Sequence, residues 1–385
     1  MTSPEIHDYL NHQSTSAYFI EYEGFFTNHL SHGVIALHRL QATHPRLERF
    51  ANWYRPKLET PESDIDDARP VEKLLGERTA FYRILQHYET LLKEKYNSNT
   101  EELIKGEYPK VSAGLAGSAL HGTIHLGYSY SIGNTRGILE GLAYTYHSFR
   151  PVTSAHDSST YGKFGDGSKD ILTILSDITA NTALQEALTT GRETERWRSL
   201  TIGRFQIGVC YILAEHGDEL LKYTHSLKID DTLRSADSSI DPVKLARRVV
   251  YWVVLAYASA ANVNDFFILH GVTCAWGIYQ FISRLDKADA VDVLKHFMVT
   301  LFAVYIVQHA PPALTAKIQP RNVTADDWAK LVEKTLDADR DEHCYKLVQV
   351  CKEMAEDAAA NGEEEHIFYQ AACNAIANEF VIRPP

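Results

Sequence analysis

The chain of 385 residues carries 50 acidic and 38 basic residues, which gives a formal net charge of −12. An acidic surface repels phosphate backbones, so this balance argues against a nucleic-acid partner. Hydrophobic residues make up 45% of the chain and aromatic residues 11%, which supplies ample apolar surface for a core and excludes general disorder.

The sequence contains no signal for export or membrane insertion. Its first residues lack a basic segment followed by an apolar segment, and a run of about 18 apolar residues does not occur. The five cysteines are scattered and form no CxxC pair, so we interpret them as reduced, mostly packed thiols. We therefore expect a cytoplasmic protein that does not enter a membrane.

Apolar residues recur at helical spacing along most of the chain. Between Phe25 and Leu40 they form one stripe of an α-helix. The uncharged, small-residue-rich segment Ala113–Ser131 predicts a helix buried on most sides, and Gly137–Phe149 predicts a second apolar helix that packs on it as a hairpin. The same pattern predicts further helices at Val71–Tyr96, Ile171–Leu188, Thr201–His216, Val243–Ala260, Phe266–Leu285, Val291–Gln308, Asp326–Leu336 and Tyr345–Ala360.

Three further features complete the predicted architecture. The segment Arg150–Asp170 is rich in Ser and Gly without periodicity, which predicts a long loop that could act as a lid. The apolar run Val249–Val254 also fits a buried strand, but its helical neighbours favour a helix. Thr324 and Asp327 match a helix-starting capping box. No repeat or low-complexity linker occurs, so we predict an all-α protein with a single large helical domain over residues 1–385.

The residues most able to carry chemistry are histidines. Motifs for dinucleotide or nucleotide binding, zinc proteases and serine hydrolases are absent from the sequence. Two histidine pairs, His29 with His32 and His121 with His125, are spaced so that both imidazoles share one helix face and can reach one metal ion. With 18 histidines in the chain, however, two such pairs are no more than chance provides, so packed or surface histidines remain an alternative.

The surroundings of these histidines distinguish them. His121 and His125 lie in a segment without charged residues, where a desolvated imidazole needs a metal or a hydrogen-bonding partner. His29 lies at the edge of the apolar stripe of its helix, whereas His32 projects toward the opposite face. His270 ends a strongly apolar segment, where a core histidine bonded to a carbonyl is the alternative interpretation.

Three groups of sequence strings resemble the questin oxidase-like family. They are EGFFTNHLSH with IALHRL within residues 23–40, HGTIHLGY with EGLA within residues 121–143, and DFFILHGVT at residues 265–273. The resemblance runs in the same order from about residue 15 to about residue 315. It implies a helical oxygenase that opens an anthraquinone ring in polyketide metabolism, by a Baeyer–Villiger type insertion or a dioxygenative cleavage, with a non-haem iron held by histidines.

The resemblance also implies a set of ligands in a buried, histidine-lined pocket. Its NHxxH motif falls on His29 and His32, its HxxxHLG motif on His121 and His125, and its apolar-histidine motif on His270. His32 is the less certain member of this set. Imidazoles without thiolates suit Fe(II), and an open coordination position is needed for O₂.

Other residues are candidates for supporting roles. Some family members carry a lysine before a Tyr-x₅-Pro pattern, which Tyr305 and Pro311 reproduce here with Lys295 upstream. Lys295 is therefore a less certain carbamate ligand, with a helix-surface lysine as the alternative. Glu140 is an alternative carboxylate ligand, although it better suits orienting a ligand imidazole or bonding the backbone. Tyr128 and its neighbouring tyrosines could stack on a planar aromatic ligand or simply fill the core.

The sequence thus predicts an Fe(II) oxygenase whose partners are a small aromatic substrate and O₂. A flavin- or NADPH-dependent monooxygenase is an alternative, although the missing dinucleotide motif counts against it; NADPH stays open as an additional cofactor. A metal-dependent hydrolase would use the same histidines with a bound hydroxide. From another class, the chain could be a non-catalytic helical binding protein. The sequence assigns no catalytic residue, no organic-cofactor site and no oligomeric state.

Overall fold

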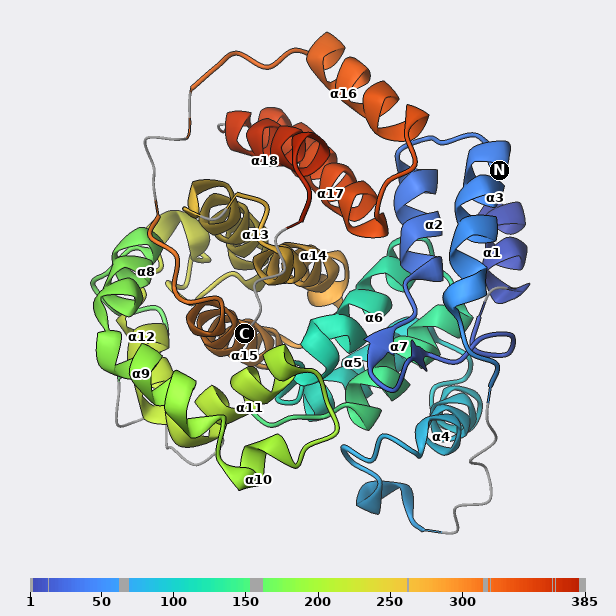
Figure 1. The fold of residues 1–385 in the computed structure, drawn as a ribbon, viewed down its shortest axis with the longest axis horizontal. Coiled ribbons are helices and arrows are strands. Elements are labelled where there is room, and N and C mark those ends of the chain that lie inside the picture. Colours follow the sequence, from blue (N-terminus) through green and yellow to red (C-terminus); the bar gives the residue numbers. More distant parts are fainter. Residues whose placement is uncertain are drawn as a thin grey trace.

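The computed structural model describes residues 3–12, 14–61, 69–152, 162–261, 263–313, 318, 320–361, 363 and 365–380. Over these residues the protein is built almost entirely of helices (Figure 1), which confirms the all-α prediction. In the described part of the chain the only paired strands are β1 (Glu21–Tyr22) and β2 (Phe26–Thr27), which form a two-stranded antiparallel hairpin.

The α-helices are joined by connections of very different length, the longest of which lie between α3 and α4 and between α7 and α8. The first seven are α1 (Ser3–His12), α2 (Leu30–Arg39), α3 (His44–Tyr54), α4 (Phe81–Glu94), α5 (Thr100–Ser112), α6 (His121–Ser131) and α7 (Thr135–His147). The next five are α8 (Ile171–Ala180), α9 (Thr182–Gly191), α10 (Glu195–Arg198), α11 (Arg204–Glu215) and α12 (Gly217–Ser226). The last six are α13 (Pro242–Ser259), α14 (Phe266–Phe281), α15 (Lys287–Val307), α16 (Ala325–Asp337), α17 (Glu342–Ala360) and α18 (His366–Ala377).

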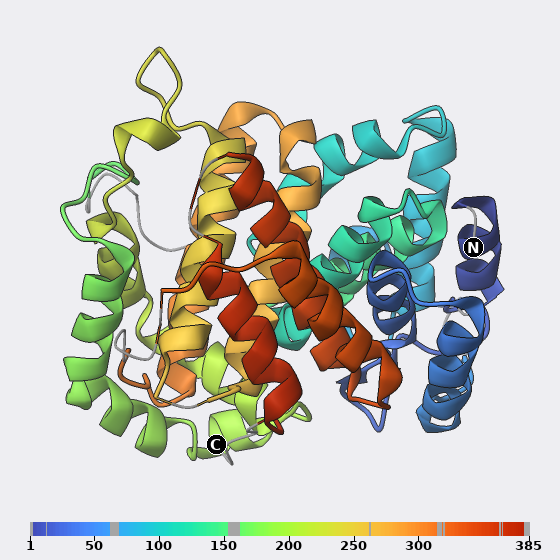
Figure 2. The same cartoon turned by 90° about the horizontal axis from the view of Figure 1, so that it is seen from above.

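Helix α14 lies at the centre of the molecule. It contacts α6, α13, α15 and α17, and nearly all of its side chains are buried because it is apolar on every face. Helices α17 and α18 lie side by side across one face (Figure 2), and α17 also packs on α2. The segments Phe266–Arg284 and Lys287–Val307 are long and apolar enough to cross a membrane, but 72% and 78% of their apolar windows are buried inside the protein.

Glycines allow α6 to pack closely against α7 and α14. The predicted hairpin is present, with Gly141 against the backbone of Leu126. On the other side of α6, a Cβ added to Gly127 would lie 2.2 Å from the Cα of Gly277 in α14. The backbones of α6 and α14 therefore touch, and this contact brings together two segments that are about 150 residues apart in the sequence.

Several predicted helices start later than their apolar pattern suggests. The predicted helix Phe25–Leu40 begins only at Leu30. A turn at Gly24, with φ of +80°, places the residues on either side of it in the β1–β2 hairpin. Phe26 is therefore a strand residue that is 44% exposed, and it does not belong to a buried helical stripe. The predicted helix Ala113–Ser131 likewise begins at His121, after a short 3₁₀ segment.

Two other predicted helices are interrupted. Val71–Tyr96 contains a 3₁₀ turn at Val71–Lys73 and then α4, because Gly76 adopts a φ of +78° between them. Ile171–Leu188 is divided into α8 and α9 at Asn181, whose side chain accepts a hydrogen bond from the backbone of Leu184 and caps the second helix.

The remaining architectural predictions have mixed outcomes. The run Val249–Val254 is helical within α13, and Thr324 forms the predicted capping box with Asp327 at the start of α16. Within the predicted lid Arg150–Asp170, residues 153–161 lie outside the described part of the chain, so the lid stays a prediction. The single-domain organisation likewise stays a prediction.

Candidate metal centre

Four buried histidines from distant parts of the chain converge at the centre of the protein. One ring nitrogen from each lies within 4.8 Å of those of the others, and the side chains are at most 6% exposed. We call this group the four-histidine cluster; its members are His29, His121, His270 and His343. His29 precedes α2, His121 begins α6, and the other two lie near the starts of α14 and α17, so the N-terminal ends of four helices meet here.

Each histidine of the cluster is oriented through its Nδ1 atom. Backbone carbonyls accept hydrogen bonds from His121, through Ser118 at 2.5 Å, and from His270, through Phe266 at 2.7 Å. A carbonyl oxygen only accepts, so in both rings Nδ1 carries the proton and Nε2 keeps its lone pair. The Nδ1 atom of His343 lies 2.6 Å from a carboxylate oxygen of Asp341.

The Nδ1 atom of His29 faces a carboxylate and a phenol. It lies 3.2 Å from Glu342 Oε1 and 3.3 Å from the hydroxyl of Tyr54. These contacts leave the Nε2 atoms to face one another: those of His29 and His121 are 2.7 Å apart, and that of His343 is buried with no hydrogen-bonding partner among the described residues. This pattern, one nitrogen anchored and the other facing its counterparts, is the arrangement found around bound metal ions.

Three of the four imidazoles of the cluster are favoured in their uncharged form. Burial lowers the pKa of His29, His121 and His270 well below the ordinary value, and the neighbouring imidazoles and Lys346 lower it further. The positive ends of the converging helix dipoles act in the same direction. Neutral imidazoles are the form that binds metals, so protons compete only weakly for these ring nitrogens.

Lys346 lies beside the cluster, one helical turn after His343 in α17. Its side chain is fully buried, and its Nζ atom has no hydrogen-bonding partner among the described residues. Burial lowers its pKa to about 8, against a smaller opposing effect of Glu342 and Asp341. Glu342 has its own pKa raised by burial and by Asp341, and its Oε2 atom is also without a partner among the described residues. Unsatisfied buried polar atoms of this kind are unusual and indicate a missing ligand or ion.

A cavity of about 290 Å³ opens onto the cluster. Five phenylalanines contribute to its wall, beside charged and polar residues such as Arg78 and Glu342: Phe25, Phe26, Phe205, Phe266 and Phe267. The rings of Phe205 and Phe267 stack 3.6 Å apart, and all four histidines of the cluster line the same cavity. The site therefore combines a group of potential metal ligands with a slot suited to a flat, apolar molecule.

The structure brings together some of the predicted ligands and separates others. His29, His121 and His270 belong to the cluster, whereas His32 and His125 form a second row beside it. In this row His32 Nε2 lies 3.0 Å from His125 Nδ1, and His125 Nε2 lies 3.3 Å from Glu140.

Glu140 closes the second row at its outer end. Its Oε1 atom accepts hydrogen bonds from Thr15 and Arg136. Although burial raises the pKa of Glu140, contacts with His125, Arg136 and Thr15 lower it to about 2. Glu140 thus orients a histidine, as its position suggested, but that histidine is not a member of the cluster.

The other predicted residues lie away from the cluster. Lys295 is a half-buried residue of α15 that is neither in the cluster nor in the lining of the cavity. The hydroxyl of Tyr305 donates to the carbonyl of Pro311, so this pattern closes the end of α15. Tyr128 is buried against His32 and Trp276 and does not line the cavity.

His343 and Lys346 are the site residues that sequence reasoning missed. Both lie beyond residue 315, where the quoted resemblance ends, and the predicted helix began only at Tyr345. One signal was present: two basic residues occupy the first turns of a helix, where the macrodipole disfavours them.

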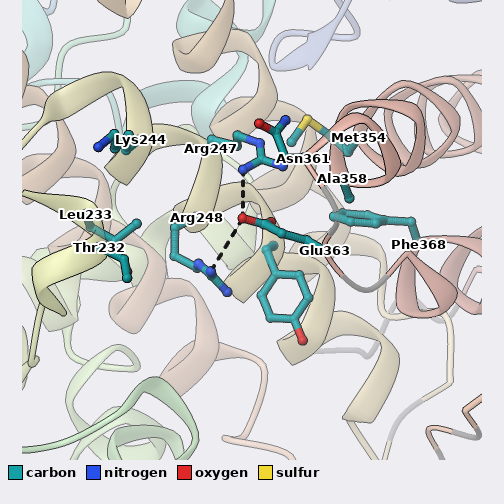
Figure 3. Close-up of a pocket in the computed structure, with 11 residues that line it drawn as sticks. Thr232, Leu233, Lys244, Arg247, Arg248, Met354, Ala358, Asn361, Glu363 and Phe368 are labelled. Carbon is teal, nitrogen blue, oxygen red and sulfur yellow. Dashed lines mark hydrogen bonds and ion pairs between the residues drawn. The ribbon is translucent and has the colours of Figure 1, made fainter.

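A second hollow lies between α13, α17 and α18 (Figure 3). Its arginines are engaged by carboxylates: Arg247 pairs with Asp357 and Glu363, and Arg248 approaches Glu363. This hollow shares no lining residue with the cavity over the four-histidine cluster. Because its arginines are already paired with carboxylates, the cluster is the stronger candidate site.

The sequence profile of a family described as questin oxidase-like matches residues 26–351, which include every residue of the cluster and Lys346. The chain belongs to the questin oxidase-like family. Membership suggests an oxygenase that acts on anthraquinones. Among curated proteins, no sequence matches the chain significantly. The family match extends beyond the quoted resemblance at its C-terminal side and takes in α17, which supplies His343.

Proposed function

We propose that this questin oxidase-like protein is a non-haem iron oxygenase that cleaves a carbon–carbon bond in a ring of an aromatic polyketide such as an anthraquinone. The observation that carries the proposal is the four-histidine cluster, with its anchored Nδ1 atoms and converging Nε2 atoms beneath an aromatic cavity. Its partners would be the aromatic substrate and O₂, and it would act in the cytoplasm without nucleic acid or membrane.

The donor set supports Fe(II) as the metal. His29, His121, His270 and His343 would hold it through Nε2, without the thiolates that structural zinc sites favour. When bound, the metal would supply the redox chemistry that lets O₂ react with an organic substrate. Asp341, Ser118 and Phe266 keep the imidazoles oriented, which restricts the directions from which the ion can be approached.

Lys346 would complete the site as a carbamate. Its amine is buried beside the cluster, and a pKa of about 8 leaves part of it neutral and nucleophilic near physiological pH. A neutral amine adds to CO₂ with loss of one proton, forming an N–C bond and a carboxylate. The carbamate oxygen would offset part of the charge of the cation. Its formation would also remove the buried positive charge at Lys346 Nζ, which has no hydrogen-bonding partner among the described residues. The carbamate prediction therefore moves from Lys295 to Lys346.

The cavity would bind and orient the substrate. The stacked Phe205 and Phe267 offer a flat aromatic surface, and the hairpin residues Phe25 and Phe26 flank the opening. This wall would hold a planar ring system over the cluster and exclude water from the reacting carbon atoms. Glu342 lines the cavity, and its Oε2 atom accepts no hydrogen bond from the described residues, so this carboxyl group is placed to contact a phenolic or quinone oxygen of the substrate.

The test is oxygen consumption by protein loaded with Fe(II) under anaerobic conditions. With an anthraquinone as substrate, we expect oxygen uptake and a ring-opened product seen by mass spectrometry, and neither from His343→Gln at equal folded concentration. Parallel reactions with and without NADPH show whether a reductant is needed. Full activity of metal-free protein, a requirement for flavin, or turnover under strict anaerobiosis would contradict the proposal, the last of these in favour of a hydrolase.

A further inference from the structure

The backbone just before His121 has an unusual conformation. Three consecutive residues other than glycine have positive φ: Ser118 at 44°, Ala119 at 51° and Leu120 at 73°. Side chains with a Cβ atom disfavour this left-handed region, and single residues visit it far more often than consecutive ones. A segment of this kind persists only where its surroundings hold it, and such strain is concentrated at functional sites. We call residues 118–120 the left-handed turn.

Gln206, a residue of α11, holds the left-handed turn through its side-chain amide. Its side-chain oxygen accepts a hydrogen bond of 2.8 Å from the backbone N–H of Ala119, and its Nε2 donates to the carbonyl of Ala116 at 3.0 Å. One buried amide thus binds the backbone at two points. Because α11 carries Gln206 on its buried side, the turn is fixed to a rigid element.

A second contact anchors the first residue of the turn. The hydroxyl of Ser118 donates to Glu21 at 3.1 Å and accepts from Arg78, and these two residues form a partly buried ion pair with each other. The turn is therefore held through its backbone by Gln206 and through one side chain by Glu21 and Arg78.

The left-handed turn sets the orientation of a histidine of the cluster. The carbonyl of Ser118 accepts the proton of His121 Nδ1 at 2.5 Å, and the same ring then directs Nε2 toward His29 at 2.7 Å. A right-handed conformation at residues 118–120 would move this carbonyl away from the ring. The direction of the His121 lone pair thus depends on a backbone conformation that the residues of the turn themselves disfavour.

We propose that Gln206 is a positioning residue for the metal centre: it holds Ala119 in the left-handed region and thereby aims His121 at the ion. This inference rests on the proposed function, because it requires that the four-histidine cluster binds a metal. Gln206 acts through the turn and needs no contact with the metal. Groups that orient metal ligands typically change metal affinity about 10- to 100-fold when removed.

The experiment measures Fe(II) affinity by anaerobic titration and ligand geometry by the absorption bands of the Co(II)-substituted protein. Gln206→Leu should bind Fe(II) about 10- to 100-fold more weakly than the unmodified protein and should show altered Co(II) bands. Gln206→Met keeps the volume of the side chain and should behave alike if the leucine variant does not fold. Gln185→Leu is the matched control, since it removes a glutamine that donates to the carbonyl of Ile306 far from the turn, and it should bind iron normally.

A double variant separates positioning from simple packing. Glycine adopts positive φ without penalty, so Gln206→Leu combined with Ala119→Gly should recover most of the lost affinity and the original Co(II) bands. If Gln206 merely filled space, a glycine at position 119, which is 87 residues away in the sequence and on another element, would not restore its effect. Unchanged affinity in Gln206→Leu, or no recovery in the double variant, would overturn the inference. Failure of the unmodified protein to bind iron would instead overturn the proposed function.

Discussion

Lys346 lowers the stability of the folded, metal-free protein, although it is proposed to complete the metal site. A buried amine without a hydrogen-bonding partner destabilises the folded state whenever it is protonated, and its pKa of about 8 measures this effect. Because the unfolded chain retains an ordinary lysine pKa near 10.5, the unfolded state binds more protons between pH 8 and 10.5. The stability of the metal-free protein therefore rises with pH across this window, and the full penalty is present below it.

Replacing Lys346 with methionine should stabilise the metal-free protein and weaken its metal site. The free energy of unfolding should rise by about 1–4 kcal/mol at pH 7, since a well-packed apolar group often stabilises a site that held buried charge. The gain should shrink toward pH 10.5, where the lysine is neutral in both states. Urea unfolding at pH 7 and pH 10, with iron affinity measured in parallel, checks both effects. A destabilised variant at pH 7 would contradict this account.

Residue types and local context predicted part of the site. His29, His121 and His270 were selected because they lie at apolar positions and in motifs resembling those of the family, and the structure brings all three into the cluster. Helical spacing alone favoured His125 equally with His121. The structure separates them, because His121 is the first residue of α6 with its ring turned back to Ser118, while His125 faces His32 and Glu140. Helical spacing alone does not predict that the His121 and His125 rings point in different directions.

At the scale of elements, the contact between α6 and α14 aligns the histidines that these helices carry. Gly127 and Gly277 lie at the crossing, where the two backbones touch. A Cβ atom at position 127 would lie 2.2 Å from the Cα of Gly277, whereas a Cβ at position 277 would meet its nearest neighbour, the carbonyl oxygen of Thr123, at 3.3 Å. The same substitution should therefore have unequal effects at the two positions.

Gly127→Ala should destabilise the protein by about 1–3 kcal/mol or more, because a backbone contact cannot be relieved by a side-chain rotation. It should also weaken iron binding, since the two helices must separate and His121 moves relative to His270. Gly277→Ala is the matched control and should lie much closer to the unmodified protein in both respects. Thermal unfolding and iron titration of the pair measure the difference. Equal effects, or a larger effect at position 277, would show that the crossing does not align the site.

The positions of helices were more predictable than their ends. Apolar periodicity located α13, α14 and α15 because their burial follows from composition alone. Apolar periodicity wrongly extended the helix at Phe25–Leu40 into the hairpin. The pattern does not distinguish aromatic residues that line a cavity from aromatic residues that fill a core. The helix break at Asn181 depends on a local cap, in which its side chain accepts a hydrogen bond from the backbone of Leu184, and the left-handed turn at residues 118–120 depends on contacts with Gln206 and Glu21. Apolar periodicity does not predict either kind of contact.

At the scale of the whole molecule, the cluster joins segments that are far apart in the chain. Its histidines lie at or near the N-terminal ends of α2, α6, α14 and α17, so a bound metal would link the N-terminal part of the protein to residue 343. A ligand that binds the folded state alone stabilises that state by mass action.

Removal of the metal should therefore lower the thermal midpoint by several degrees. At a free metal concentration about 100-fold above the dissociation constant, the stabilisation is roughly 2.7 kcal/mol. Differential scanning calorimetry of iron-loaded and chelator-treated protein checks this, and re-addition of Fe(II) should restore the midpoint. The difference should be absent in His343→Gln. A midpoint that is independent of iron in the unmodified protein would show that the metal does not tie these helices together.

The most direct test of the central claim is the iron content of two matched variants, His343→Gln and His125→Gln, after anaerobic loading and removal of free metal. The claim is that the metal is held by His29, His121, His270 and His343 and not by the second row of histidines. We predict about one iron per chain in the unmodified protein and in His125→Gln, and a large loss in folded His343→Gln. Iron retained by His343→Gln but lost from folded His125→Gln would contradict the assignment.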